Sequence, residues 1–288
     1  MSALRLGSRT FGPREFAVMA IVNRTPDSFF DRGATFDPDA ALRAVESAVA
    51  EGADLIDIGG VKAGPGAEVD AAEEIRRTVP TVAAVRARFP DVVISIDTWR
   101  AEVAREAIGA GADLVNDTWG GADPGLAVVA AETGAGLVCS HAGGLAPRTR
   151  PHRVAYADVV AEVRAAVCVL ADQALSAGVR RDGLLIDPTH DFGKNTRHSL
   201  ELTRRLSELV DTGWPVLVAL SNKDFVGETL DLPVDDRLDG TLAATTVSAW
   251  LGARVFRAHQ VRRTRRVLDM VASIRGYRPP AVVRRGLA

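Results

Sequence analysis

The most constraining feature of this 288-residue chain is a regular alternation between short apolar runs and longer helical patterns. Eight runs are rich in Val, Ile and Leu and nearly continuous, as expected of strands buried on both faces of a parallel sheet. They are FAVMAIV (16–22), ADLIDI (53–58), VVISI (92–96), ADLVN (112–116), GLVCS (136–140), GLLID (183–187), PVLVAL (215–220) and ARVFRAH (253–259). Eight strand–helix units in a chain of this length predict an α/β protein with a (β/α)8 TIM barrel as one domain over residues 1–288.

The segments between the runs support this fold. The clearest helix spans residues 37–53, with Asp37 as a cap, a proline after it and a glycine near its end. An open doubly wound sheet is the alternative, and it would need a glycine fingerprint after its first strand. The segment there is NRTPDSFFD (23–31), which is no such fingerprint. Residues 277–288 are expected to form an extended and mobile C-terminal tail.

Composition narrows the partners and the compartment. The net charge of −2 gives no global attraction for nucleic acid or for an acidic membrane. The two cysteines, Cys139 and Cys168, make no disulfide framework, which is typical of a reducing cytosol. No secretory h-region and no apolar run near 20 residues is visible, so we expect a soluble, cytoplasmic protein that binds a small molecule.

Polar residues follow every predicted strand, at the end where a barrel carries its active site. One polar residue at the start of a loop is commonly a cap or a turn, so the inference rests on the whole set. The set comprises Asn23, Asp57, Asp97 with Thr98, Asn116 with Asp117, Ser140 with His141, Asp187, Ser221 to Lys223, and Arg257 with His259.

The chemistry of this set suggests a ligand with two parts. Asp97, Asn116 and Asp187 suit a flat heterocycle with ring N–H and amino donors. Donors at the ends of the last two strands suit a phosphate or diphosphate; these are Lys223, Arg257 and His259. Asn23 could offer an amide oxygen to Mg²⁺, which commonly binds through substrate phosphates.

At these residues the sequence resembles the dihydropteroate synthase family. The matching stretches run in the family's order from residue 19 to 261; they are MAIVNRTPDSFFDRG, GADLIDIGG, ISIDT, GADLVND, DPTHDFGKN, LSNKDFVGE, RLDGTLAA and FRAHQV. The resemblance implies a pterin-binding TIM barrel, usually a homodimer. It implies a transferase of folate biosynthesis that joins 6-hydroxymethyl-7,8-dihydropterin diphosphate to p-aminobenzoate.

Roles carry over from the family by motif. The resemblance assigns the pterin to Asp97, Asn116, Asp187 and Lys223, the diphosphate to Arg257 and His259, and Mg²⁺ to Asn23. It places Asp31 beside the cationic pterin centre left when diphosphate departs, so that Asp31 and Lys223 are the expected catalytic residues. Phe29, Pro65 and Phe192 match positions that wall the p-aminobenzoate site. Stabilisation of the leaving diphosphate by cations and Mg²⁺ is ordinary electrostatic catalysis.

The departures from the family concentrate on the second substrate. After the second strand the family's Glu-Ser-Thr-Arg-Pro-Gly is replaced by VKAGPG (61–66), which removes a hydroxyl at Ala63 and a guanidinium at Gly64. Asp224 replaces a hydroxyl near the acceptor, and Trp119 replaces a small residue. Lys62, Arg24 and Arg32 are candidates to replace the lost cation, although solvated loop charge is the simpler interpretation. This pattern resembles the family's divergent second-copy paralogues.

Three functions therefore remain open. The first is dihydropteroate synthase-type transfer to p-aminobenzoate. The second is a divergent paralogue that binds pterin without this turnover, or that uses another acceptor. The third is a pterin-dependent methyl carrier, which needs no diphosphate site and so does not explain Arg257 and His259. The histidines lack metal-ligand spacing, and RRTRR (262–266) is interpreted as a solvated helix face.

Overall fold

The computed structural model describes residues 3–26, 33–149 and 155–286 of the chain. Eight parallel strands form one sheet in the order β8-β7-β6-β5-β4-β3-β10-β9. The sheet closes between β8 and β9 through a bridge that pairs Ile186 with Val216, and Ile186 N donates to Pro215 O at 3.0 Å. The strands are β3 (Ala17–Asn23), β4 (Leu55–Gly59), β5 (Val93–Asp97), β6 (Leu114–Asp117), β7 (Gly136–Ser140), β8 (Leu184–Asp187), β9 (Leu217–Ala219) and β10 (Val255–Ala258). The predicted (β/α)8 barrel is confirmed.

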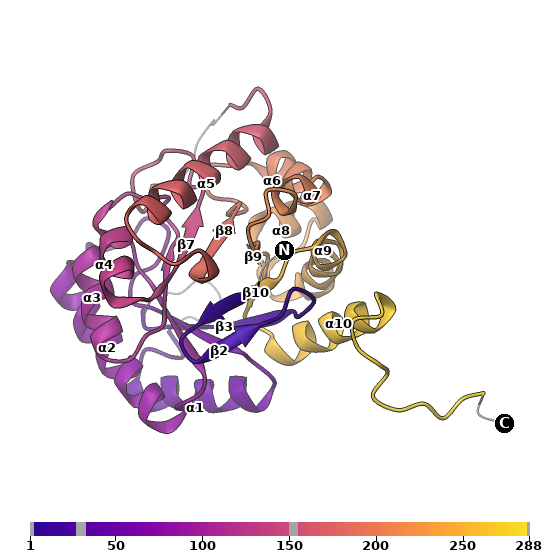
Figure 1. Ribbon diagram of the computed structural model, residues 1–288, viewed down its shortest axis with the longest axis horizontal. Coiled ribbons are helices and arrows are strands. Elements are labelled where there is room, and N and C mark those ends of the chain that lie inside the picture. The colour runs from indigo at the N-terminus through magenta and orange to yellow at the C-terminus, as the bar shows by residue number, and fades with distance from the viewer. Residues whose placement is uncertain (1–2, 27–32, 150–154, 287–288) are drawn as a thin grey trace.

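A ring of helices surrounds the barrel (Figure 1). These helices are α1 (Pro38–Ala50), α2 (Ala71–Arg88), α3 (Ala101–Gly109), α4 (Gly125–Thr133), α5 (Val159–Ser176), α6 (Thr196–Arg204), α7 (Ser207–Val210), α8 (Asp224–Leu230), α9 (Leu238–Leu251) and α10 (Val261–Ile274). Two short 3₁₀ turns, Arg181–Gly183 and Val234–Asp236, complete the elements. The helix predicted over 37–53 begins as expected, because Asp37 Oδ1 accepts from Ala40 N at 2.8 Å and Pro38 occupies the first turn.

Two apolar cores follow from the alternation of side chains along the strands. The larger core lies between the strands and the helices, where Val18, Ile56, Ile94 and Phe256 are buried. The smaller core fills the barrel interior with the opposite faces of the same strands, and it contains Ala17, Met19, Leu55, Val93, Leu114, Val138, Leu185, Leu217 and Val255. The strands are thus apolar on both faces, which is why they read as continuous hydrophobic runs.

An N-terminal hairpin that the sequence analysis did not predict completes the inner core. Strands β1 (Leu4–Leu6) and β2 (Arg9–Phe11) pair antiparallel around a two-residue turn in which Gly7 has a φ of 54°. Leu4, Leu6 and Phe11 pack with the residues near the amino ends of the barrel strands. The hairpin therefore covers that end of the barrel, and the opposite end is left for the site.

The chain beyond α10 lies apart from the barrel. Residues 278–286 are exposed, and Figure 1 shows this segment extending away from the ring of helices. One contact ties its start to α10, where Arg278 Nη1 lies 2.7 Å from Asp269 Oδ1. Within the described residues, none of the helices combines the length and the apolar character needed to cross a membrane.

Candidate functional site

The parallel sheet brings the predicted strand-end residues to one mouth of the barrel. Asn23, Asp97, Ser140 and Asp187 are the last residues of β3, β5, β7 and β8. The remaining members lie in or just after the other strands; they are Asp57, Asn116, Lys223, Arg257 and His259. Because all eight strands point the same way, the expected convergence of these side chains is a consequence of the topology.

Arg257 occupies the centre of this set. Its Nε donates to Asp57 Oδ2 at 2.6 Å, and its Nη2 donates to Asp97 Oδ2 at 2.7 Å. Asp57 is fully buried and also accepts from Ser95 Oγ at 2.6 Å and, more weakly, from Asn116 Nδ2 at 3.3 Å. Burial alone would lower the pKa of Arg257, but Asp57 and Asp97 more than offset it, and the net shift is upward. Arg257, predicted to bind the diphosphate, is thus in direct contact with Asp97, predicted to bind the pterin.

The carboxyl group of Asp97 has an unusually high pKa. Desolvation is the largest cause of its raised pKa of about 6; Arg257 opposes the shift and the neighbouring Asp57 charge adds to it. Thr118 Oγ1 donates to Asp97 Oδ1 at 2.8 Å, which orients the carboxylate. Burial also raises the pKa of Asp187, whose Oδ1 accepts from Thr189 N at 2.7 Å. Both carboxylates can therefore accept from a heterocycle while ionised, and burial makes both easier to protonate than a carboxyl in water.

The opposite side of the mouth is built around Phe192. Lys223 Nζ lies 4.6 Å from the centre of the Phe192 ring and donates to His190 O. Trp119, which is buried, packs edge-on against Phe192 with ring centres 5.2 Å apart. The indole of Trp119 therefore supports Phe192, a predicted wall of the second-substrate site.

Lys194 is a buried residue of the barrel mouth that no sequence motif predicted. Its buried Nζ donates to three backbone carbonyls, at 2.8 Å to His141, 3.1 Å to Thr189 and 2.7 Å to Phe192. Burial lowers its pKa to about 7. The loop after β8 takes positive φ angles at Thr189 (51°), Asp191 (70°) and Gly193 (62°), and Lys194 holds this strained loop together. Lys194 is therefore an anchor of the loop after β8.

His259 is placed as a neutral donor. Its Nδ1 lies 3.1 Å from Ser221 Oγ, and the same hydroxyl lies 3.1 Å from Gln260 Oε1, so its one proton can go to either acceptor. Burial, with the Arg257 charge next, lowers the pKa of His259 to about 3. In the tautomer whose Nδ1 accepts from Ser221, the neutral imidazole carries its proton on Nε2 and would meet an arriving diphosphate with an N–H group. Arg257 and Lys223 are then the cations of the predicted set.

Arg24 does not replace the missing loop cation. Its buried guanidinium donates to Arg77 O at 3.0 Å, Thr35 O at 2.9 Å and Phe36 O. Arg24 is thus neither a solvated loop charge nor a ligand group. Its hydrogen bonds hold the loop after β3 against helix α2. Asp31, Phe29 and Arg32 lie outside the described residues, so their predicted roles remain predictions. Lys62 stays on the loop after β4, half-buried.

The charge of Asp224 should repel an anionic acceptor only weakly. Arg237 Nη1 donates to Asp224 Oδ1 at 2.9 Å and to Asn222 O at 3.0 Å. The Asp224 side chain is 81% exposed, so water and Arg237 both screen it. The carboxylate that replaces a hydroxyl in this loop is therefore compatible with an anionic acceptor nearby.

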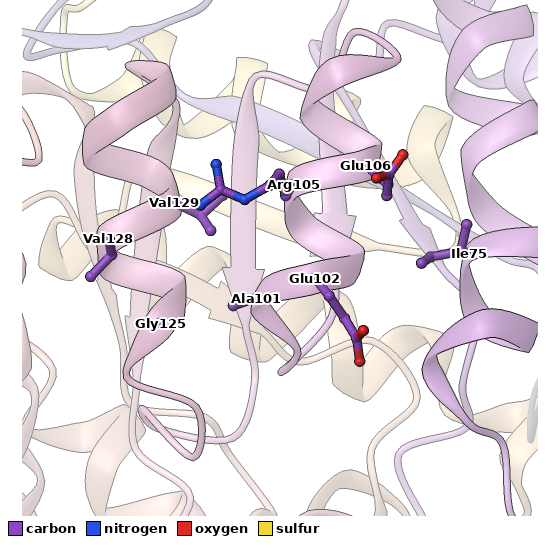
Figure 2. A pocket seen from close by; sticks show the side chains of 8 residues that line it. All are labelled: Ile75, Ala101, Glu102, Arg105, Glu106, Gly125, Val128 and Val129. Atoms are coloured by element: carbon purple, nitrogen blue, oxygen red, sulfur yellow. The ribbon is translucent and has the colours of Figure 1, made fainter.

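A groove on the outside of the barrel is separate from this site. Figure 2 shows it between α3 and α4, with a volume of about 460 Å³ and a lining of Ile75, Ala101, Glu102, Arg105, Glu106, Gly125, Val128 and Val129. A second groove of about 390 Å³ runs from His259 along α10, over Arg262, Arg263 and Arg266. These three arginines are exposed, as predicted for a solvated face, and Arg262 Nη2 pairs with Glu51 Oε1 at 3.2 Å. Arg265 of the same run departs from the prediction, because it is half-buried and its Nη2 donates to Phe16 O at 3.1 Å.

Asn23 is the described residue that the sequence predicts for a cation. Within residues 3–26, 33–149 and 155–286, no group of three His, Cys, Asp or Glu side chains could hold a metal ion. Asn23 ends β3 at the mouth, and Thr35 Oγ1 donates to its backbone oxygen at 2.6 Å, which fixes the chain there. One amide oxygen with substrate oxygens suits Mg²⁺, which keeps most of its waters, so this site remains a prediction.

The fold and the site together define a class: a (β/α)8 barrel whose mouth holds carboxylates, an amide and cations for a polar heterocycle and an anion. A model of the pterin-binding enzymes matches residues 19–259, and the chain belongs to that family.

Individual relatives place the chain within the family. It is 62% identical over 275 residues to an inactive dihydropteroate synthase 2 of Mycobacterium leprae, with 94% of each chain covered. It is 40% identical over 254 residues to the dihydropteroate synthase of Haemophilus influenzae, which covers 88% of this chain and 92% of that protein. The crystal structure of the Yersinia pestis dihydropteroate synthase in complex with a sulfonamide superposes with a TM-score of 0.90 at 35% identity, covering 96% of this chain and 100% of that one. The resemblance inferred from the motifs is confirmed, including its kinship with second-copy paralogues.

Proposed function

We propose that this protein binds 6-hydroxymethyl-7,8-dihydropterin diphosphate and transfers its pterin methylene group to an arylamine acceptor of the p-aminobenzoate class. The observation that carries the proposal is the contact of Arg257 with both Asp57 and Asp97 at the barrel mouth. This contact places a fixed guanidinium directly beside the carboxylate predicted to accept from the pterin ring. The anionic and heterocyclic parts of one ligand would thus meet neighbouring groups.

The chemistry follows from these positions. The methylene C–O bond to the diphosphate breaks, the acceptor nitrogen forms a C–N bond to the same carbon, and the nitrogen then loses a proton. Asp97, Asn116 and Asp187 would hold the pterin through its N–H donors. Arg257, Lys223 and the N–H of His259 would stabilise the charge on the departing diphosphate. Mg²⁺, held by Asn23 and the substrate, would neutralise further charge on that group.

A second candidate function is pterin binding without transfer to p-aminobenzoate. Two observations favour it: Ala63 and Gly64 lack the side chains that the family uses for the acceptor, and the relative that is 62% identical is named inactive. A hydrogen bond to a charged group contributes about 1.5–3 kcal/mol, so the losses at 63 and 64 would weaken acceptor binding by about two to four decades without compensation. The methyl-carrier alternative is disfavoured by Arg257 and His259, since such a protein has no diphosphate to hold.

One set of measurements separates these functions. Calorimetry with the pterin diphosphate and Mg²⁺ reports on the pterin half of the site, and formation of dihydropteroate from added p-aminobenzoate reports on transfer. Binding with product supports the first proposal, and binding without product selects the second. Free diphosphate should raise the melting temperature if the anion site exists. Absence of any pterin binding would refute both proposals.

We further propose that the protein is a homodimer through α9 and α10. Both helices expose large apolar side chains, with Trp250 at 55%, Met270 at 61% and Ile274 at 60% exposure. The two helices pack against each other on one side of the barrel (Figure 1), and Arg275 Nη1 links them by donating to Trp250 O at 2.7 Å. Neighbouring exposed apolar side chains of this size are typical of a protein–protein interface.

A further inference from the structure

The loop that lacks the family's arginine is held by an arginine from another part of the chain. Arg148, in the loop after β7, donates from Nε to Gly64 O at 3.3 Å and from Nη1 to Ala67 O at 2.8 Å. These two carbonyls flank Pro65, the residue predicted to wall the acceptor site. A guanidinium therefore contacts the loop at Gly64, which is the position where the family carries an arginine and this chain does not.

The two loops come from well-separated strands. Both leave the barrel at the carboxyl ends of their strands, but β4 and β7 are separated in the sheet by β5 and β6. The contact between Arg148 and residues 64–67 thus reaches past the ends of the strands that carry Asp97 and Asn116. This places the guanidinium at the carboxyl end of the barrel strands, which is the end that also carries the predicted pterin residues.

The backbone at Arg148 is strained, which is unusual for a residue with only a surface role. Its φ is 65°, and Thr149 N donates to Ala146 O at 3.3 Å, so residues 146–149 form a turn. Pro147 has its φ fixed near −65° by its ring, and a positive φ after such a proline is the pattern of a type II turn, where glycine or asparagine is favoured. An arginine there costs about 1–3 kcal/mol, and such strain commonly accompanies function.

The charge of Arg148 is not matched by a carboxylate. Among the residues that the structure describes, its contacts are the two neutral carbonyls, which use two of its five N–H groups. Its side chain is half-buried, so a bound anion would be partly shielded from water. The remaining N–H groups, including those of Nη2, are suited to a carboxylate, which a guanidinium can bind with two parallel hydrogen bonds.

We propose that Arg148 is the acceptor-binding residue of this protein, supplying to the carboxylate of an aryl acceptor the guanidinium that position 64 lacks. This rests on the proposed function and names the residue that would bind the carboxylate of its second substrate. Arg148 would also keep Pro65 in position, because the same side chain fixes the loop on both sides of it.

The test uses the neutral analogue 4-aminobenzamide beside p-aminobenzoate. Both are titrated by calorimetry into the full-length protein saturated with 6-hydroxymethyl-7,8-dihydropterin, diphosphate and Mg²⁺, which lack the bond that is transferred. The parent protein should prefer the carboxylate by roughly tenfold to a hundredfold, the range expected of one charge-assisted pair. Arg148→Gly should abolish this preference and leave pterin affinity unchanged.

Glycine is the informative substitution because relief of the positive φ offsets part of the two hydrogen bonds lost, so the variant should remain folded, as its melting temperature will report. The double variant R148G/G64R should regain the preference. Among the described residues, a Cβ added at position 64 would have the flexible Lys62 as its neighbour, with Cε at 3.9 Å. Arg105→Ala, which removes an exposed arginine paired with Glu132 on the outer surface, is the matched control and should change nothing.

The outcomes are distinct. If R148G weakens both acceptors equally, Arg148 only fixes the loop and the proposal is wrong. If the parent binds the pterin but does not prefer the carboxylate, the proposal is also wrong while the pterin half of the proposed function stands. Failure of the parent to bind pterin refutes the proposed function, and with it the acceptor role of Arg148.

Discussion

Arg257 Nη2 donates to Asp97 Oδ2 at 2.7 Å, so the guanidinium expected to meet a diphosphate already touches a carboxylate expected to meet the pterin. The two groups are interdependent. Arg257 favours the ionised form of Asp97, whereas burial and Asp57 oppose it. A ligand that brings an anion to Arg257 will therefore compete for the same cation, and the ionisation of Asp97 will respond.

This coupling predicts a pH dependence of pterin binding. The pKa of Asp97 is raised to about 6, so its ionised, accepting form is complete only above that pH. Affinity for 6-hydroxymethyl-7,8-dihydropterin should hold between pH 7 and 8 and fall below pH 6, approaching tenfold per pH unit. Calorimetric titrations across this range measure it.

Asp97→Asn supplies the control for this dependence. It should lower affinity at pH 7.5 by roughly tenfold or more and flatten most of the slope near pH 6, with any remainder due to Asp187. The same raised pKa has a consequence for folding: between about pH 4 and 6 the folded chain keeps a proton that the unfolded chain has lost. The Asp97 contribution to stability therefore decreases as the pH rises through this window. A profile of D97N as steep as that of the parent would contradict the assignment.

A second prediction concerns Asp224, which the sequence marks as a repulsive change. Because Arg237 pairs with it and its side chain is 81% exposed, Asp224→Ser should alter p-aminobenzoate affinity by less than about fivefold. The small effect should shrink further in 0.5 M salt. A gain of a hundredfold or more would show that Asp224, rather than the loss at positions 63 and 64, sets the acceptor affinity.

A third prediction tests Arg24 as a structural residue. Arg24→Ala leaves three backbone carbonyls near α2 and residues 35–36 without their donor, which should lower the free energy of unfolding by about 2–4 kcal/mol. The melting temperature should fall by roughly 4–12 °C. Arg43→Ala, on the exposed side of α1, should leave it within about 1 °C. If R24A keeps the parent stability but loses acceptor affinity, Arg24 is a ligand group after all.

The sequence predicts the strands and the residues at their ends more accurately than the contacts between those residues. The observed ends of the eight barrel strands lie within two residues of their predicted positions, because strands buried on both faces must be continuously apolar. Asp97, Asn116 and Asp187 follow directly from this, since a strand end fixes where its last residues lie. The hairpin at Leu4–Phe11 was missed because three-residue strands carry too little periodicity to recognise.

Long side chains account for most of what the sequence could not show. Arg257 lies on β10 but reaches carboxylates on β4 and β5, and Arg24 turns inward from a loop where a solvated charge was expected. Lys194, in the loop after β8, binds the carbonyl of His141, in the loop after β7. Arg148, in the loop after β7, binds the carbonyl of Ala67, in the loop after β4. Such contacts depend on which loops approach one another in the folded chain, and a local sequence pattern does not predict that approach.

The last prediction addresses the proposed dimer through Trp250. This side chain is 55% exposed on α9, and Arg275 lies 5.5 Å from its ring, so the ring is presented at the surface where α9 meets α10. Sedimentation at micromolar concentration should give a parent particle of two 30.5 kDa chains. Trp250→Glu should give single chains, because a carboxylate placed in a desolvated apolar interface has no partner there and costs several kcal/mol.

Val128→Glu, a change of similar exposure on α4, is the matched control and should remain dimeric. The barrel mouth lies elsewhere, so W250E should still bind pterin, and its loss of pterin affinity would indicate unfolding rather than dissociation. A parent that sediments as one chain, or a W250E variant that remains dimeric, would exclude this surface as the interface.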